Sequence, residues 1–270
     1  MKLINKYVKL KIIKELTKGS GYLLSELELV KKVAKDVNNK GGRMFYVGGC
    51  VRDEIMWGGT ENSKDIDVET YGLTLDEFSE VLRNYGEVNE IGKSFGVLNL
   101  AHYDIDFSLP RRERKVASGH QGFDVTVDPY ISYEGALLRR DFTMNALLKD
   151  VLTGELIDPY GGVEDIKNKV IRVVNDKTFI EDELRVFRAC QFASRFGFSM
   201  DEKVVHLAKE FDYNLSPERM YTEFNKGLLK SKKPSVFLEG LLKTGAIKNY
   251  PELEALIGCE QNPEFHPEGD

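Results

Sequence analysis

Apolar residues recur at helical spacing between residues 25 and 38, and this pattern predicts the first helix of the chain. The apolar stripe consists of Leu27, Val30, Val33, Ala34 and Val37. Ser25 and Glu28 have the spacing of a capping box, in which each side chain accepts a hydrogen bond from the other residue's backbone N–H. The pair Gly41-Gly42 predicts where this helix ends and the chain turns into a strand.

A second capping box, Thr74 and Glu77, predicts a helix that runs to about Tyr85 and stops at Gly86. Short apolar or alternating runs precede and follow this helix. They predict strands at residues 44–47, 65–69, 88–91, 97–100 and 103–109. This order of elements predicts an α+β fold with a small mixed sheet and helices on one side.

Two carboxylates lie on one face of the predicted strand at residues 65–69. Because side chains alternate across a strand, Asp65 and Asp67 point to the same side. Carboxylate oxygens suit Mg²⁺, a hard cation that proteins commonly hold through one or two carboxylates together with substrate phosphates. The strand therefore indicates a site for a divalent metal and a phosphate-bearing substrate.

A paired-glycine turn precedes that strand and supports the same interpretation. Gly48 and Gly49 follow an apolar strand and lead into a helical turn that carries Arg52 and Asp53. Because glycine has no Cβ, backbone N–H groups at such a turn can approach phosphate oxygens closely. The alternative interpretation is a tight turn followed by an acidic, exposed strand that binds neither metal nor nucleotide.

A second alternating run places Asp104 and Asp106 on one face of the strand predicted at residues 103–109. The segment that follows, residues 110–128, shows no clean period and combines charged residues with glycines. We therefore expect a mobile loop there. An exposed carboxylate on an edge strand is the alternative role for Asp106.

Composition limits the class of protein. The chain has 270 residues, enough for one large or two modest domains, and its formal net charge of −6 argues against nonspecific adhesion to nucleic acid. Its three cysteines are widely spaced and form no CxxC pair, which fits a reducing compartment and no thiolate zinc site. The N-terminus interleaves lysines with apolar residues, without the apolar core of a signal peptide or a membrane span. We expect a cytoplasmic protein with no membrane partner.

Four motifs stand in an order that resembles one known family: GGCVRD at residues 48–53, DIDVET at 65–70, RRDFTMNA at 139–146 and EDELR at 181–185. They are similar to those of the class II tRNA nucleotidyltransferases (the CCA-adding enzymes) and the related bacterial poly(A) polymerases of the polymerase-β superfamily. The resemblance implies a polymerase-β-like nucleotidyltransferase head, an all-helical neck and the start of a helical body.

The resemblance implies a catalytic centre with two Mg²⁺ ions held by Asp65 and Asp67, and with Asp106 as a third carboxylate on a neighbouring strand. It also implies nucleotide contacts by Gly48, Gly49, Arg52, Asp53, Arg139, Arg140, Asp141, Asn145, Asp182, Arg185 and Arg188. Among these, the adjacent arginines and aspartate of RRD suit a triphosphate and ribose, because guanidinium groups match phosphate oxygens.

Asp182 and Arg185 are three residues apart at the predicted start of a helix, so an exposed intrahelical ion pair is one interpretation. In the family this pair instead reads the incoming base. The carboxylate accepts from the exocyclic amine of C or A, and the arginine donates to a ring nitrogen or carbonyl. U and G present the wrong pattern on that edge, so protein side chains would act as the template.

Three further groups are expected to support the site rather than to take part in the chemistry. Asp158 and Arg172, with the DPYGG turn between them, would join head to neck. The RNA-supporting neck residues would be Arg219, Glu223 and Lys226, which share one helix face. The flexible loop that the family uses to switch between nucleotides would contain Arg112, Glu113 and Arg114.

The expected parts are an N-terminal helical extension (1–24), the head (25–174), the neck (175–230) and the start of the body (231–270). The body is expected to be cut short soon after it begins. One departure from the family is Trp57-Gly58-Gly59, where relatives usually have Leu-Gly-Arg.

The activity implied is template-independent addition of CMP and AMP from CTP and ATP to a tRNA 3′ end, with release of pyrophosphate. The alternatives within the family are a poly(A) polymerase and an enzyme that adds only CC or only A. The segment 91–97 is more similar to the CCA-adding version. A noncatalytic RNA-binding remnant is the alternative from another class, and the sequence does not indicate an oligomeric state.

Overall fold

The computed structural model describes residues 25–58, 66–89, 95–115, 123–213, 215–260, 262 and 264–265, with the side chains of 113–115 and 123–124 left out. Its contacts divide the chain into two compact units, and each is described by itself. The sheet unit contains Met1–Arg112, Val125–Ser132 and Leu148–Ile157, and the helical unit contains Glu113–Asp124, Tyr133–Leu147 and Asp158–Asp270. The domain boundaries expected at residues 174 and 230 stay a prediction.

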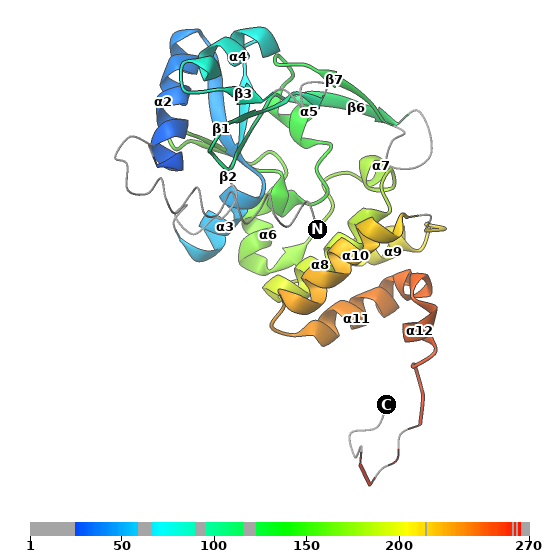
Figure 1. Ribbon diagram of the computed structural model, residues 1–270. Helices are drawn as coiled ribbons and strands as arrows, with labels where there is room; N and C mark the ends of the chain where they lie inside the picture. The colour runs from blue at the N-terminus through cyan, green and yellow to red at the C-terminus, as the bar shows by residue number, and fades with distance from the viewer. Residues whose placement is uncertain are drawn as a thin grey trace. The chain divides into compact units, whose positions relative to one another are not determined.

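A seven-stranded mixed sheet forms the sheet unit (Figure 1). In spatial order its strands are β3 (Val88–Asn89), β4 (Val97–Leu100), β5 (Ile105–Ser108), β2 (Ile66–Tyr71), β1 (Arg43–Val47), β8 (Leu148–Asp150) and β9 (Leu156–Ile157). The neighbours β2 and β5 run parallel, and the other neighbouring pairs run antiparallel. The α+β fold class with a mixed sheet is thereby confirmed.

The helices described in the sheet unit are α2 (Glu26–Asn39), α3 (Gly49–Trp57) and α4 (Leu75–Arg83), and two of them, α2 and α4, begin where their capping boxes predict. Ser25 and Thr74 each accept a hydrogen bond from the N–H of the residue three positions on, and both capping boxes are complete. These bonds satisfy N–H groups that have no partner within the helix, which is why α2 and α4 begin at these residues.

Helices cover the apolar face of the sheet. Val68 and Phe107 are buried register partners on β2 and β5, and the Phe78 ring of α4 lies 6.1 Å from the Phe107 ring in an edge arrangement. α2 packs beside α4 and against β1. Since side chains alternate along a strand, Asp67 and Asp106 point to the opposite face.

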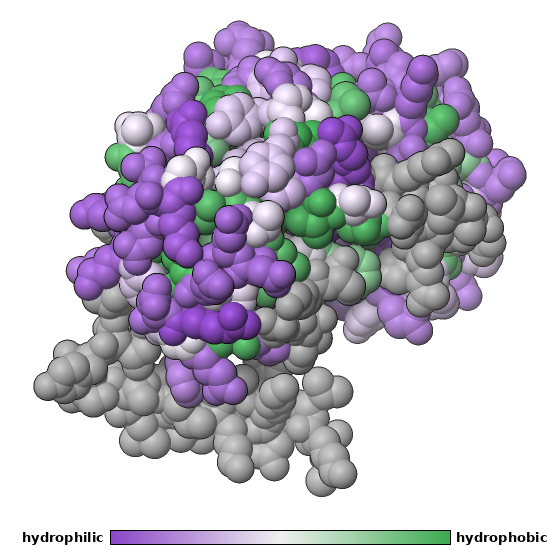
Figure 2. All heavy atoms as spheres, turned by 90° about the horizontal axis from the view of Figure 1, so that it is seen from above, coloured by the Kyte–Doolittle hydropathy of each residue, from purple (hydrophilic) through white to green (hydrophobic). Residues whose placement is uncertain are grey.

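The segment expected to be a mobile loop contains regular structure. β6 (Arg111–Lys115) and β7 (Phe123–Val127) form a two-stranded sheet, so the expectation of an irregular segment across 110–128 is wrong at both ends. The charged sequence of β6 shows no apolar alternation, but Phe-Asp-Val-Thr-Val of β7 does alternate and was an available signal for a strand. The face of the molecule seen from above α4 is mostly hydrophilic, with small scattered apolar patches (Figure 2).

In the helical unit, several other helices pack against α8 (Figure 1). Its elements are α5 (Tyr133–Leu137), η3 (Thr143–Asn145), α6 (Gly162–Asn168), β10 (Val170–Ile171), α7 (Asp176–Phe179), α8 (Leu184–Phe196), β11 (Ser199–Met200), α9 (Glu202–Ala208), α10 (Pro217–Leu229), α11 (Pro234–Thr244), η4 (Ala246–Asn249) and α12 (Pro251–Glu254). The neck is therefore not all helical, because β11 pairs in parallel with β10. No helix in the described residues is both long and apolar enough to cross a membrane.

Two glycines allow α8, α10 and α11 to approach one another. A Cβ on Gly227 of α10 would lie 2.5 Å from the Phe237 ring of α11, and one on Gly240 would lie 3.1 Å from Cys190 Sγ of α8. Burial raises the pKa of the Cys190 thiol to about 12, so the thiol remains neutral in this core. Close helix packing fixes the position of the polar face of α8.

We expect Gly42→Ala to destabilise the fold by about 1–3 kcal/mol. A Cβ at Gly42 would lie 2.7 Å from the Tyr71 carbonyl oxygen and 2.9 Å from Val37 Cγ1, and the β2 backbone cannot shift without disturbing the sheet. Urea unfolding measures the effect. The control Glu80→Ala removes only an exposed ion pair with Lys40, so an equal loss in both variants would contradict the packing argument.

Candidate functional site

The structure brings two of the predicted catalytic carboxylates together. Asp67 and Asp106 are register partners on the parallel strands β2 and β5, so their side chains lie next to each other on one face. Asn99 of β4 donates from Nδ2 to Asp106 Oδ1 at 2.6 Å and to the Ile105 carbonyl at 3.0 Å, which holds the Asp106 carboxylate in place. Asp65 lies outside the described residues.

The exposure and the donor set of this pair fit a hard divalent cation. Asp106 is exposed and Asp67 is partly exposed, so both carboxylates are accessible to a ligand. Within the described residues no group of three or more His, Cys, Asp or Glu side chains is placed to hold a metal. Two carboxylates completed by substrate phosphate oxygens are a normal Mg²⁺ environment, so the pair suits a cation that arrives with a nucleotide.

The paired-glycine turn lies at the start of α3, close to Asp67. Gly48 has φ 62° and ψ −119°, a conformation that residues with a Cβ rarely adopt. The Cys50 thiol, whose pKa burial raises to about 11, contacts the Asp67 carbonyl oxygen at 3.7 Å and so ties α3 to β2. The N-terminus of α3 offers N–H groups and a positive dipole end, which favour an anion there. The predicted phosphate-binding turn therefore adjoins the carboxylates.

Arg52 and Asp53 follow that turn and contact each other. Arg52 is buried, and its Nε and Nη2 donate to Asp53 Oδ1 at 2.8 Å and 2.6 Å. In the segment predicted to be the flexible loop, Arg112 donates to Asp128 Oδ2 at 2.8 Å. The side chains of Glu113 and Arg114 in the same segment lie outside the described residues. The nucleotide-binding and loop roles expected for these residues stay predictions.

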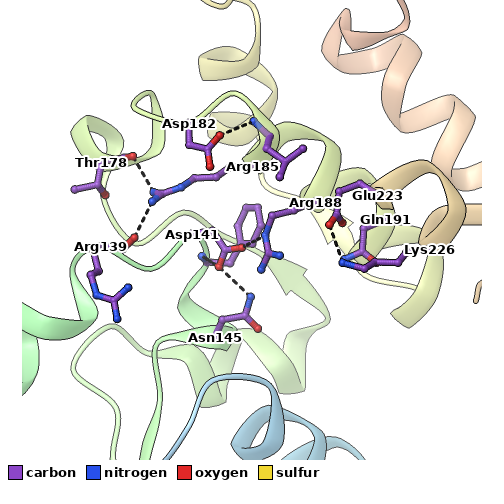
Figure 3. Close-up of polar contacts among 12 residues, drawn as sticks. Arg139, Asp141, Asn145, Thr178, Asp182, Arg185, Arg188, Gln191, Glu223 and Lys226 are labelled. Carbon is purple, nitrogen blue, oxygen red and sulfur yellow. Dashed lines mark hydrogen bonds and ion pairs between the residues drawn. The ribbon is translucent and has the colours of Figure 1, made fainter. Parts of the chain in front are cut away.

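In the helical unit, Asp141 is the centre of a buried polar network (Figure 3). Its Oδ1 accepts from the Phe142 N–H at 2.8 Å and from Asn145 Nδ2 at 3.0 Å, and its Oδ2 accepts from Arg188 Nε at 2.6 Å. Burial alone would raise the pKa of Asp141, but the Arg188 charge, these hydrogen bonds and the Arg185 charge outweigh it and lower the pKa to about 2. The network ties the RRD segment to α8.

Arg188 is held from two sides. Its guanidinium lies over the Phe192 ring, 5.2 Å from the centroid, while Asp141 holds its Nε. The Asp141 charge raises the pKa of Arg188 above its ordinary value, so the group stays cationic. Because Asp141 balances its charge, Arg188 acts here as a fixed partner that holds α8 against the segment carrying Arg139 and Arg140.

In the structure Asp182 and Arg185 make two separate sets of contacts and no ion pair with each other is seen among the described residues. α8 begins only at Leu184, so Asp182 precedes the helix and its Oδ1 accepts from the Leu184 N–H at 3.1 Å. Arg185 instead donates to the carbonyl oxygens of Thr178 at 2.8 Å and Arg139 at 2.7 Å (Figure 3). Asp182 forms its ion pair with Arg219 of α10, with Nη2–Oδ2 at 2.9 Å. The intrahelical ion pair is therefore excluded as the explanation of this motif.

The DPYGG segment caps the start of α6 and is held by Arg172. Asp158 accepts from the N–H groups of Gly162 at 2.7 Å and Val163 at 2.9 Å, at the start of α6. Arg172 donates to Asp165 and to the Tyr160 carbonyl oxygen at 2.9 Å, so it holds the turn that Asp158 opens. These contacts lie within one unit, and the expected hinge between head and neck stays a prediction.

Lys226 and Glu223 form an ion pair on α10, with Nζ–Oε1 at 2.8 Å, and Glu223 is buried (Figure 3).

Three features of the site were not predicted from the sequence: the roles of Asn99 and Asp165, and the pairing of Arg219 with Asp182. The alternation of β4 places Asn99 on the carboxylate face and was an available signal. Nothing in the sequence indicated the other two, because both depend on how distant segments pack.

Comparisons with known proteins agree with these motifs. Residues 44–172 match the model of the poly A polymerase head domain, and residues 197–257 match the model of the probable RNA and SrmB-binding site of polymerase A. A multifunctional CCA protein of Stenotrophomonas maltophilia is 39% identical over 237 residues, which are 84% of this chain and 56% of that protein. The corresponding protein of Vibrio parahaemolyticus is 37% identical over 237 residues, with the same shares.

Solved structures give the same result at the level of the fold. The Bacillus stearothermophilus CCA-adding enzyme in complex with CTP is 28% identical with a TM-score of 0.66, covering 82% of this chain and 53% of that one. The Thermotoga maritima CCA-adding enzyme complexed with tRNA is 26% identical with a TM-score of 0.65, covering 82% and 51%.

The chain belongs to the class II nucleotidyltransferases, the family of the CCA-adding enzymes. The resemblance seen in the motifs is confirmed, as is the assignment to the nucleotidyltransferases. This nucleotidyltransferase spans a little over half the length of the curated relatives that it matches. Its superfamily typically uses divalent metals, which agrees with the oxygen-only donors of Asp67 and Asp106.

We expect Asp141→Asn to destabilise this nucleotidyltransferase by about 2 kcal/mol or more at pH 7, because Arg188 would lose its buried counter-charge. The folded pKa of about 2 lies below the ordinary 3.8, so the stabilisation is fully present above pH 5. It is lost as the pH falls from about 4 towards 2. Urea unfolding of wild type and variant across this range should show their difference shrinking. Glu252→Gln, an exposed carboxylate in the same unit, is the control, and a pH-independent difference for Asp141→Asn would contradict the assignment.

We expect Gly162→Ala to cost about 2–4 kcal/mol of stability. A Cβ there would lie 2.2 Å from the Thr143 carbonyl oxygen, and both segments are tied down by the Asp158 cap and by Asp165. Thermal unfolding measures the loss. Gly197→Ala is the matched control, since a Cβ at Gly197 meets nothing within 4 Å and only its φ of 69° is unfavourable. Equal losses would exclude the steric explanation.

Proposed function

We propose that the chain adds CMP and AMP to the 3′ end of tRNA, as a CCA-adding nucleotidyltransferase. In this reaction the RNA 3′ oxygen attacks the α-phosphorus of CTP or ATP, a new phosphodiester forms, and the α–β bond breaks to release pyrophosphate. The observation that supports the proposal best is the placement of Asp67 beside Asp106, next to the paired-glycine start of α3. Solved CCA-adding enzymes that the chain is similar to are described as complexes with tRNA, with CTP and with ATP.

Mg²⁺ fits the carboxylate face, with Asp65 and Asp67 as the residues that would hold two ions and Asp106 beside them. When bound, such ions lower the pKa of the attacking hydroxyl and neutralise the leaving pyrophosphate. The protein's own contribution is positioning. Asn99 holds Asp106, the N-terminus of α3 attracts phosphate oxygens, and the fixed sheet register keeps the carboxylates at one spacing.

The helical unit would select the nucleotide. Asp182 accepts hydrogen bonds and Arg185 donates them, which complements the amine and the ring acceptor of C and A and opposes the pattern of U and G. Arg139 and Arg140 supply positive charge for the triphosphate, and Asp141 keeps their segment attached to α8 through Arg188. Selection by side chains explains how a polymerase works without a template strand.

A poly(A) polymerase and an enzyme that adds only CC or only A share all of these groups, and so would a remnant that binds RNA without catalysis. The greater similarity of the segment 91–97 to CCA-adding enzymes favours the first proposal, although residues 91–94 lie outside the described part of the chain. The curated relatives at 37–39% identity are called multifunctional CCA proteins, which favours it further.

Primer extension with Mg²⁺ tests the proposal. The purified chain should add C, C and then A to tRNA that lacks its CCA end, and then stop. Asp67→Ala should lower the rate by at least about a thousandfold, because removing a metal-holding carboxylate removes electrostatic stabilisation of the transition state. Asp104→Asn, an exposed carboxylate that precedes β5, should retain activity. An Asp67→Ala protein that polymerises would refute the mechanism, and a long A tail or CC alone would assign a sibling activity.

A further inference from the structure

Asp182 is the carboxylate expected to accept from the base, and a second residue in the helical unit fixes its orientation. Arg219 of α10 donates from one nitrogen, Nη2, to Asp182 Oδ1 at 3.1 Å and to Oδ2 at 2.9 Å. The Leu184 N–H donates to Oδ1 at 3.1 Å. Both side chains of the pair are about three quarters buried, with 24% of Arg219 and 26% of Asp182 exposed.

The contact is specific to one partner. In the described residues every hydrogen bond and ion pair of the Arg219 side chain goes to Asp182. Its neighbours on the same helix face behave differently, because Glu223 and Lys226 pair with each other. Arg219 therefore does not brace α10 through a general network. It holds one carboxylate, 37 residues earlier in the chain.

Holding that carboxylate matters because of how an aspartate rotates. The terminal torsion of Asp is broad and roughly two-fold, so a carboxylate anchored by one backbone N–H can still turn. A carboxylate has about four lone-pair positions. A donor placed between both oxygens fixes the plane and leaves the other lone pairs directed one way, as acceptors for a ligand's amine.

We propose that Arg219 is a specificity-determining positioning residue, which orients Asp182 so that it accepts from the amine of C or A and rejects U and G. The proposal rests on the proposed function, since it concerns the same nucleotide. U and G present a carbonyl oxygen where C and A present the amine, and a fixed acceptor facing an acceptor is left unpaired and disfavoured. A carboxylate free to turn away would tolerate the wrong base.

The test is single-nucleotide addition by the full chain with each of the four nucleoside triphosphates. We expect Arg219→Gln to lower the ratio of kcat/KM for CTP over UTP by about tenfold or more, chiefly by raising KM for CTP. Arg219→Lys should restore most of the ratio, because a single ammonium can contact both oxygens as Nη2 does. If Arg219 had used two different nitrogens, one for each oxygen of Asp182, a lysine could not reproduce the contact, because it has a single nitrogen.

The matched control is Lys203→Gln, which also removes one cation and one ion pair, with Asp176 at 2.8 Å in the same unit. It should leave the CTP-to-UTP ratio unchanged. Thermal unfolding of each variant checks folding, and Arg219→Lys carries the test if Arg219→Gln does not fold. An unchanged ratio in a folded Arg219→Gln protein overturns the inference. So does an equal loss of kcat/KM for all four nucleotides, which is the result of a merely structural role.

Failure of the proposed function gives a different result from failure of this inference. If wild type selects CTP over UTP and the variant selects equally well, only the role of Arg219 is wrong. If wild type binds CTP with Mg²⁺ but does not extend RNA, selectivity is measured by binding. The ratio of the dissociation constants for UTP and CTP is then compared between wild type and Arg219→Gln. If wild type neither extends RNA nor binds CTP, the proposed function is wrong and the inference falls with it.

Discussion

Asp141 of the helical unit is a buried carboxylate. Burying a charge is costly unless hydrogen-bond donors and a counter-charge replace the water that it loses. Its three donors come from its own segment and from α8, namely the Phe142 N–H, Asn145 and Arg188. Loss of Arg188 would leave the buried carboxylate without its counter-charge, and loss of either other donor would leave it less well compensated for the water it has given up. The RRD segment and α8 therefore take one relative position, and the arginines on both are positioned by the same constraint.

The sheet unit obeys a different constraint, which is register. Parallel pairing of β2 with β5 determines that Asp67 faces Asp106, and a shift by one residue would turn one of the two carboxylates to the apolar face. The buried partners Val68 and Phe107 oppose such a shift, because they pack against Phe78. The spacing of the carboxylates thus depends on the hydrophobic core behind them.

Local patterns in the sequence predicted the parts of this architecture that are decided locally. The capping boxes at Ser25 and Thr74, the strand alternation around Asp67 and the turn at Gly48 all depend on residues within a few positions of one another. The ribbon formed by β6 and β7 was missed because the charged run of β6 has no apolar alternation, and the alternation that β7 does show is a single short signal beside it. The pairing of Asp182 with Arg219 and of Asp141 with Arg188 connects segments 37 and 47 residues apart, and pattern reasoning has no access to such contacts.

One contact has a consequence for how tightly a nucleotide can bind. Arg185 donates to the carbonyl oxygens of Thr178 and Arg139 through two of the five N–H groups that a guanidinium has, so the side chain is held in place before a nucleotide arrives. A base that accepts from the other N–H groups therefore does not have to order this side chain on binding. Under the proposed function, this preorganisation lowers the entropic cost of binding a matching base, whereas a mismatched base still leaves a donor or an acceptor unpaired.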